Sequence, residues 1–210
     1  MKQTARLAIV CMAVLSFSGY AHNVTIPKDI NEMSLNKVTD NVYVVHGTRS
    51  MPDKANKGFI SNSGFVVSDE GVVIVDTGGS LQIGEMLLQK ISEVTDKPVI
   101  AVFNTHIHGD HWMGNAAIRN AYPEARIYAH ERAIERLQNG EAEQWLDMFM
   151  QSTDGAIEGT KIVLPDNALK GGESIEAAGN TFKIHHTGKA HTDNDIMIEY
   201  PEHKTLFAGD

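Results

Sequence analysis

The feature that most constrains this chain is the segment 106–111, where three histidines and one aspartate occur within six positions. Imidazole is the commonest metal ligand in proteins, and carboxylate oxygen also binds zinc. Two histidines separated by one residue project to the same side of an extended segment, so His106 and His108 are placed to share one metal ion. Asp110 and His111 follow where the chain turns, and they are placed to serve a second ion. The sequence therefore predicts a metal site with room for two ions.

The alternative is a loop of surface histidines that are hydrogen-bonded and bind no metal. One histidine, or an isolated pair, would fit that alternative well. Four ligand-type residues within six positions, interrupted by Gly109, favour the metal site. The apolar run 99–103 directly precedes the cluster and predicts a buried strand that delivers it.

The first residues have the pattern of a secretory signal peptide. Two basic residues precede the apolar run 7–15, and small residues stand three and one positions before a cleavage site at His22. We therefore expect residues 1–21 to be a signal peptide, residues 22–210 to be one mature domain, and the protein to be secreted or periplasmic. The alternative is a retained N-terminal anchor.

Composition narrows the partners of the mature chain. Cleavage would remove the only cysteine, Cys11, so any zinc must be held by histidine and carboxylate. It would also reduce the 18 basic residues to 16 against 27 acidic ones, which moves the formal net charge from −9 to −11. An acidic surface argues against a nucleic-acid partner, and no second apolar span suggests membrane contact. We expect a small-molecule substrate, and the sequence leaves the oligomeric state open.

Apolar patterning predicts a layered α/β or α+β domain, because strands with interspersed helices are followed by a late run of strands. Strands are expected at 38–46, 59–67, 72–75, 99–103, 126–129, 161–164, 181–186, 196–200 and 205–207. Helices are expected at 81–94, 112–121 and 131–150.

A tetrahedral zinc site needs a ligand beyond the first two histidines. His191 is the best placed, because it lies in the polar loop 188–195 between two expected strands, and loops on a rigid scaffold commonly carry ligands. The remaining downstream histidines are expected to pack, to support a ligand or to be solvated: His130, His185, His186 and His203.

Two aspartates end apolar runs of strand character, so they are expected at the same edge as the histidines. Asp76 follows the run 72–75 and is placed to orient a ligand histidine from behind, a common role for a carboxylate beside a metal-bound imidazole. Asp210 follows the run 205–207 and could bridge two metal ions or simply end a strand. Spacing alone leaves both alternatives open for Asp210.

Together these segments resemble the metallo-β-lactamase superfamily. The matching pieces occur in the family's order: Asp-Thr-Gly at 76–78, His-x-His-x-Asp-His at 106–111, Gly-x-Ala-His-Thr at 188–192 and Leu-Phe-Ala-Gly-Asp at 206–210. The resemblance extends over residues 38–210. It implies an αββα sandwich with the metal ions at one edge of the two sheets.

The resemblance also implies a set of metal ligands. The first zinc would be held by three histidines, His106, His108 and His191. The second would be held by Asp110 and His111. Asp210 would bridge the two ions, as in glyoxalase-II-like members. The absence of cysteine separates the chain from β-lactamases that use a thiolate at the second site. This weakens an antibiotic-resistance interpretation.

Family members continue beyond the Gly-Asp at 209–210 with further strands, a helix and a last histidine that completes the second metal site. Because this chain ends there, the resemblance implies a C-terminally truncated domain with an incomplete second half and one second-site ligand missing.

The function implied is metal-dependent hydrolysis. Zinc lowers the pKa of bound water towards neutrality and polarises a carbonyl or ester oxygen. A hydroxide held by two zinc ions would be the nucleophile, and Asp110 would be the catalytic residue that orients it or takes its proton. Alternatives on the same site are a β-lactamase proper, a thioester hydrolase or an iron-dependent oxygenase, because imidazole suits iron as well as zinc. A secreted metal-binding domain without turnover is the non-enzymatic alternative.

Overall fold

The computed structural model describes residues 33–210. The predicted signal peptide, residues 1–21, and the start of the predicted mature domain lie outside the described residues. No helix in the described part of the chain is long and apolar enough to cross a membrane.

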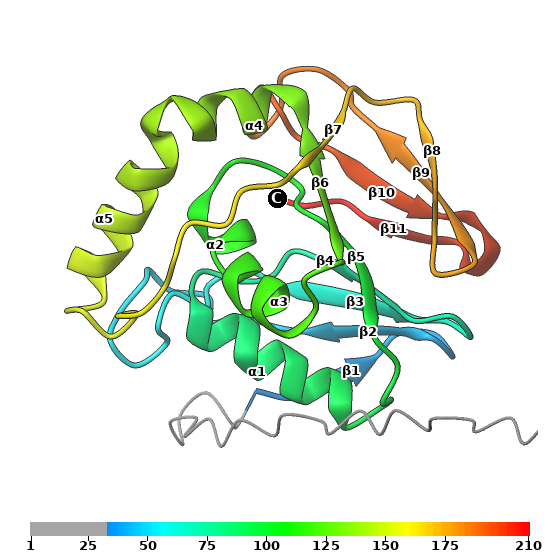
Figure 1. The fold of residues 1–210 in the computed structure, drawn as a ribbon, viewed down its shortest axis with the longest axis horizontal. Helices are drawn as coiled ribbons and strands as arrows, with labels where there is room; N and C mark the ends of the chain where they lie inside the picture. The colour runs from blue at the N-terminus through cyan, green and yellow to red at the C-terminus, as the bar shows by residue number, and fades with distance from the viewer. Residues whose placement is uncertain (1–32) are drawn as a thin grey trace, which may run out of the picture.

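A seven-stranded sheet forms the centre of the molecule (Figure 1). Its strands follow the chain order: β1 Leu35–Lys37, β2 Val42–Val45, β3 Ser63–Val67, β4 Val72–Val75, β5 Val99–Phe103, β6 Arg126–His130 and β7 Asn167–Leu169. The first four strands pair antiparallel, whereas β4 to β7 pair parallel. The carboxyl ends of β4, β5 and β6 therefore meet at one edge, where loops of such sheets commonly bind ligands.

A second, four-stranded antiparallel sheet has the order β11-β10-β9-β8. Its strands are β8 Ser174–Ala177, β9 Asn180–His185, β10 Met197–Tyr200 and β11 Thr205–Phe207, with a 3-10 turn, η2 Pro201–His203, before the last one. The two sheets enclose an apolar core in which the Phe182 ring lies 5.7 Å from Phe103 and 5.1 Å from Tyr200.

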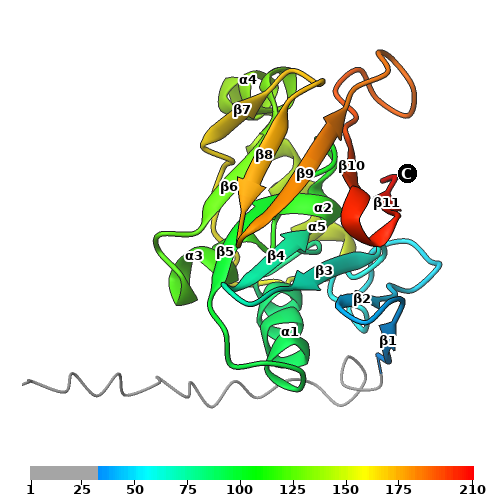
Figure 2. The ribbon, with the colours of Figure 1, turned by 90° about the vertical axis from the view of Figure 1, so that its right-hand side faces the viewer.

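The helices cover the other face of the larger sheet. They are α1 Leu81–Ser92, α2 Gly109–Trp112, α3 Asn115–Ala121, α4 Glu131–Arg136, the kinked turn η1 Leu137–Glu141, and α5 Ala142–Ser152. Helix α1 buries Ile83, Met86, Leu87 and Ile91, which recur at helical spacing along one face. In Figures 1 and 2 the four-stranded sheet lies opposite α2, α3 and α5 across the larger sheet. The predicted α/β class and layered arrangement are confirmed. The layers are stacked in the order helices, larger sheet, smaller sheet. No α-helix within residues 33–210 covers the outer face of the smaller sheet.

Five predicted elements were wrong in part. The expected strand 59–67 begins only at Ser63, and the expected helix 131–150 is broken at Asn139 and Gly140, which leave helical geometry. The expected strand 38–46 is a bend over 38–41 followed by β2, because β1 pairs back on β2. The expected helix 112–121 is interrupted at Gly114, where a Cβ atom would lie 2.1 Å from the Thr77 carbonyl oxygen. The expected strand 161–164 is irregular.

The irregular segment has a tertiary cause. The Val163 carbonyl accepts a hydrogen bond from Asn115 Nδ2 at 3.2 Å, so the chain here binds to α3. The parallel ladder with β6 begins only at β7. Strands β7 and β8 were not predicted from the sequence.

Candidate metal centre

The predicted ligands come from both sheets and meet at one edge of the molecule. Asp76 follows β4, the segment 106–111 follows β5, His191 lies in the loop between β9 and β10, and Asp210 follows β11. Because β4 and β5 are parallel neighbours, their carboxyl ends place Asp76 beside the histidine segment. The fold therefore gathers residues that are more than 130 positions apart in the sequence.

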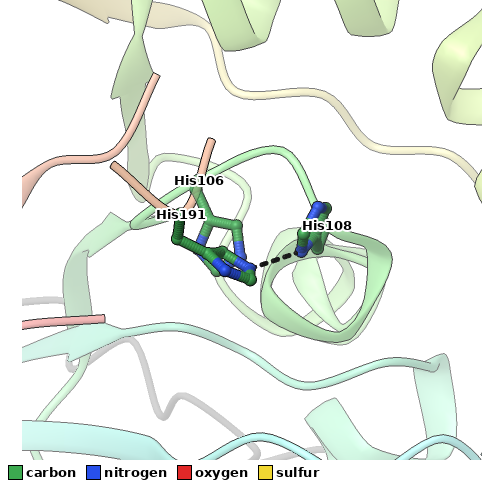
Figure 3. Close-up of side chains that lie close together, drawn as sticks. All are labelled: His106, His108 and His191. Carbon is green, nitrogen blue, oxygen red and sulfur yellow. Dashed lines mark hydrogen bonds between the residues drawn. The ribbon is translucent and has the colours of Figure 1, made fainter. Parts of the chain in front are cut away.

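The first group consists of His106, His108 and His191. One ring nitrogen from each lies within 4.8 Å of the others, and the three rings converge on a common point (Figure 3). His191 Nε2 lies 2.9 Å from His108 Nδ1. Three convergent imidazole nitrogens with one side open to solvent are the donor set of many zinc sites with an exchangeable fourth position.

The second group consists of His106, His111 and Asp210, again with ligand atoms within 4.8 Å of one another. His111 Nε2 lies 3.5 Å from Asp210 Oδ1 and 3.3 Å from Asp110 Oδ2. His106 belongs to both groups, although the resemblance assigns it to the first ion alone. Asp110 lies beside the second group without being part of it.

Two buried nitrogens show that a cation fits here. His106 Nε2 and His111 Nε2 are buried and make no hydrogen bond of good geometry among the described residues, although the Asp110 and Asp210 carboxylates lie 3.3 and 3.5 Å from His111 Nε2. Buried polar atoms of folded proteins nearly always have a partner. A metal ion between these two nitrogens and the neighbouring carboxylates would satisfy both, so the residues fit the ions that the resemblance implies.

Asp76 holds one of these imidazoles from behind. Its carboxylate lies 2.8 Å from His111 Nδ1 and accepts hydrogen bonds from the Thr105 backbone N–H and hydroxyl, each at 2.8 Å. Because the carboxylate only accepts, Nδ1 carries a proton, and in the neutral imidazole that a metal ion requires the lone pair of Nε2 faces the cluster. Asp76 has a φ of 60°, a left-handed conformation that a short polar side chain tolerates. This is the orienting position predicted for Asp76.

Amide side chains fix the backbone of the ligand segment. Asn104 Nδ2 donates to the His111 carbonyl at 2.9 Å, and Asn115 Nδ2 donates to Asn104 Oδ1 at 2.8 Å. The Ser61 hydroxyl donates to the Asp110 carbonyl at 2.6 Å. The sequence interpretation missed these residues, because single amides and hydroxyls follow no spacing rule. Only the position of Asn104, directly before the motif, could have suggested a role.

The histidines differ in their electrostatic environment. Burial, followed by the facing His111 and His108 imidazoles, lowers the pKa of His106 to about 2. Burial and His191 lower the pKa of His108. Burial by itself would also lower the pKa of His111, but the facing Asp76 carboxylate, with Asp110 and Asp210, outweighs it and raises that pKa well above the ordinary value. Without metal, the cluster therefore carries its positive charge on His111.

Acid is expected to destabilise the metal-free protein through His106. The unfolded chain takes up a proton on this residue near pH 6.5, whereas the folded chain resists protonation down to about pH 2. The contribution of His106 to stability should therefore fall as pH drops below 6.5, by up to about 1.4 kcal/mol per pH unit, whereas His111, whose pKa is raised, contributes with the opposite sign. Urea unfolding with chelator present, at pH 7 and pH 5, measures the slope.

The variant His106→Gln should lessen this slope, and His203→Gln, in η2 away from the cluster, should leave it unchanged. An equal slope for the wild type and His106→Gln would contradict the expectation.

A cavity of about 320 Å³ opens beside the first group. His108 and His191 form part of its wall, and the Trp145 ring on α5 lies 4.9 Å from the His108 ring. Phe149, on the same helix, is buried in the core. The apolar side chains of the segment 131–151 are therefore divided, some packing in the core and Trp145 lining the cavity. No residue of the polar loop 49–57 lines this cavity.

The other histidines lie outside both groups. His130 Nδ1 accepts from the Arg132 backbone N–H at 3.1 Å, and its ring packs 4.2 Å from the His186 ring. His185 pairs with Glu199 at 2.7 Å on the outer face of the smaller sheet. His203 stacks on the Tyr200 ring.

Fold and site together define an α/β protein whose two sheets meet at a cluster of histidines suited to one or two metal ions. Residues 56–210 match the sequence model of the metallo-beta-lactamase superfamily. The chain belongs to the metallo-β-lactamase superfamily, as its motifs predicted.

Two curated relatives illustrate the range of this family. The chain is 30% identical over 128 residues to a hydroxyacylglutathione hydrolase from Synechococcus sp. strain JA-2-3B'a(2-13), a match that covers 61% of this chain and 40% of the relative. It is 26% identical over 153 residues to metallo-beta-lactamase IND-1 from Chryseobacterium indologenes, covering 73% of this chain and 55% of the relative. The chain thus spans about half or less of the length of these relatives.

Solved structures confirm the fold. A metallo-beta-lactamase from Pontibacter korlensis superposes with a TM-score of 0.64 at 18% identity, covering 84% of this chain and 71% of that one. The metallo-beta-lactamase DIM-1 superposes with a TM-score of 0.61 at 22% identity, covering 84% and 69%. The predicted metallo-β-lactamase-like fold is therefore confirmed.

Proposed function

We propose that this protein is a zinc-dependent hydrolase of a small-molecule carbonyl or ester-type substrate. The observation that carries the proposal is the convergence of two ligand groups on His106, which leaves two buried imidazole nitrogens without a hydrogen-bond partner among the described residues. Family membership adds support, because the named relatives include a hydroxyacylglutathione hydrolase and a β-lactamase.

Each residue has a role that follows from its position. His106, His108 and His191 would hold one zinc ion, and His111 and Asp210 would hold a second, because the single Nε2 lone pair of His106 can bind only one of the two. A bound zinc ion would lower the pKa of a coordinated water and polarise the oxygen of the substrate. Asp76 keeps His111 in the tautomer that presents Nε2 to the cluster.

Asp110 is the proposed proton acceptor. Its Oδ2 atom lies 3.3 Å from His111 Nε2, so the carboxylate sits at the cluster without being needed to complete either group. A carboxylate in this position can hold a water molecule by accepting its hydrogen bond and can take its proton. We also propose that the protein acts outside the cytoplasm, on the basis of the signal-peptide pattern at residues 1–21.

The decisive experiment combines metal removal with a substrate panel. The purified protein is dialysed against chelator, assayed on β-lactam, lactone, thioester and simple ester substrates, and assayed again after zinc or iron is restored. We expect hydrolysis to disappear with the metal and to return with zinc. Full activity after complete metal removal would overturn the proposal, and recovery of hydrolysis with iron alone would show that iron, and not zinc, is the metal of the reaction.

The cavity gives a prediction about substrate binding. Replacing Trp145 with alanine removes the aromatic wall beside His108 and should raise KM about tenfold, equivalent to about 1.4 kcal/mol, with zinc content unchanged. Met148→Ala is the matched control, because Met148 is 43% exposed on the same helix and does not line the cavity. Steady-state kinetics on the best substrate of the panel measures both variants. An unchanged KM for Trp145→Ala would remove this side chain from the substrate site.

A further inference from the structure

The loop that carries His191 contains an asparagine with an unusual environment. Asn194 lies three residues after His191, and its side chain is fully buried at 0% exposure. Asparagine is mostly exposed in folded proteins, and a buried amide must be hydrogen-bonded to be tolerated. The partners of this side chain therefore indicate what holds it there.

The Asn194 amide joins the two ligand loops. Its Oδ1 atom accepts a hydrogen bond at 3.0 Å from the backbone N–H of Ile107, the residue between His106 and His108. Its Nδ2 atom donates at 2.9 Å to Asp193 Oδ1. One side chain thus links the loop of the third histidine to the backbone between the other two.

Asp193 carries the link further. Its Oδ1 atom also pairs with Arg136 Nη1 at 2.8 Å, and Arg136 pairs with Glu141 at 2.6 Å. Arg136 and Glu141 belong to the helical segment 131–152 and line the cavity. Asn194 is therefore held on one side by a charged network and on the other by the ligand backbone, which limits its freedom to move.

The rest of the loop is also hydrogen-bonded within itself, because the Thr192 N–H donates to Asp195 Oδ2 at 2.7 Å and the Ala190 N–H donates to the Thr192 carbonyl at 2.8 Å. His191 is exposed, and Gly188 has a φ of 87° with no atom within 4 Å of the position of a Cβ. Between residues 192 and 196 the backbone is tied to the ligand segment by the Ile196 N–H, which donates to the Thr105 carbonyl at 2.9 Å. That backbone bond would survive a change of the Asn194 side chain, so loss of the amide should loosen the ligand geometry rather than unfold the loop.

We propose that Asn194 is a positioning residue that holds His191 against the His106–His108 pair and so sets the metal affinity of the three-histidine group. The inference rests on the metal site of the proposed function and not on the hydrolytic reaction. Metal affinity depends on how far the ligands are held in place before binding. Residues that hydrogen-bond to the ligands without touching the metal typically contribute about ten- to a hundredfold to metal affinity.

The test measures zinc affinity directly. The full chain and the variant Asn194→Ala are titrated with zinc in competition with a chromophoric chelator, and folding is followed by far-UV circular dichroism. We expect about ten- to a hundredfold weaker zinc binding at the tighter site and a weaker visible absorption of the cobalt-substituted protein. Asn194→Asp keeps an oxygen for the Ile107 N–H but places a second carboxylate against that of Asp193, so it should also weaken zinc binding.

Asn180→Ala is the matched control. Asn180 also uses both ends of its amide, donating to the Ala178 carbonyl at 2.9 Å and accepting from the Tyr200 hydroxyl at 3.0 Å, but it lies in β9 away from the cluster. Its zinc affinity should equal that of the wild type.

A zinc affinity of Asn194→Ala equal to that of the wild type or of Asn180→Ala would overturn the inference, because the side chain would then have no positioning role. If the wild type binds zinc tightly but hydrolyses nothing, the proposed reaction fails and the role of Asn194 stands. If the wild type binds no zinc, both fail.

Discussion

Replacing His106 with alanine is expected to remove the zinc ion of the three-histidine group and to lower hydrolysis by about four orders of magnitude or more, the scale seen when one member of a catalytic group is deleted. The reason is geometric, because both ligand groups include His106 and its single Nε2 lone pair can bind one ion. Its side chain is 2% exposed, and its Nε2 atom has no hydrogen-bond partner among the described residues.

Metal content distinguishes this prediction from a general loss of function. Elemental analysis of the purified protein should give about half of the wild-type zinc content for His106→Ala, His108→Ala and Asp210→Ala, because each variant loses a ligand of one ion. His203→Ala serves as the control for loss of a histidine elsewhere. A His106→Ala protein with the zinc content of the wild type would show that His106 is not a ligand.

Replacing Asp76 with alanine should have the largest effect on stability. The carboxylate is 3% exposed and is the acceptor for three donors on Thr105 and His111. Removal of one member of a buried charged pair costs about 3–5 kcal/mol, because the other is left uncompensated. Alanine is also disfavoured at the φ of 60° that this residue adopts. We expect a loss of about 3 kcal/mol or more in the free energy of unfolding, measured by urea denaturation without metal.

Asp76→Asn separates charge from backbone conformation. Asparagine tolerates the same φ and fills the same space, but its amide cannot accept from all three donors. It should recover only part of the lost stability, and zinc binding by the His111 group should remain weakened. An Asp76→Ala protein as stable as the wild type would show that the buried carboxylate makes no net contribution.

Much of the candidate site could be predicted from the sequence, because its residues carry their chemistry in their side chains. His106, His108 and His191 are ligands by type, and the apolar run before the first pair identifies the strand that delivers them. Asp76 could be placed because it ends such a run. Asn194 could not, since an amide becomes informative only when its partner, Ile107, is known.

The fold could be predicted where a strand or helix is encoded by the residues of its own segment. Strands β4 and β5 are continuous apolar runs, and both were predicted at their observed bounds. The break in the helix at Gly114 depends on its contact with the Thr77 carbonyl, and the irregular course of 161–164 depends on Asn115. Both are tertiary contacts that local patterning does not encode.

The placement of the ligands on two sheets gives the site a mechanical consequence. His106, His108 and His111 follow the larger sheet, whereas His191 and Asp210 extend from the smaller one. An ion bound by members of both sets would act as a crosslink between the two sheets. It would oppose their separation at the edge where the ligands lie, beyond the apolar core between the sheets. Occupancy of the centre at a thousand times its dissociation constant would add about 4 kcal/mol to the stability of the folded state. The same residues that would perform the chemistry would then also fasten the sheets to each other.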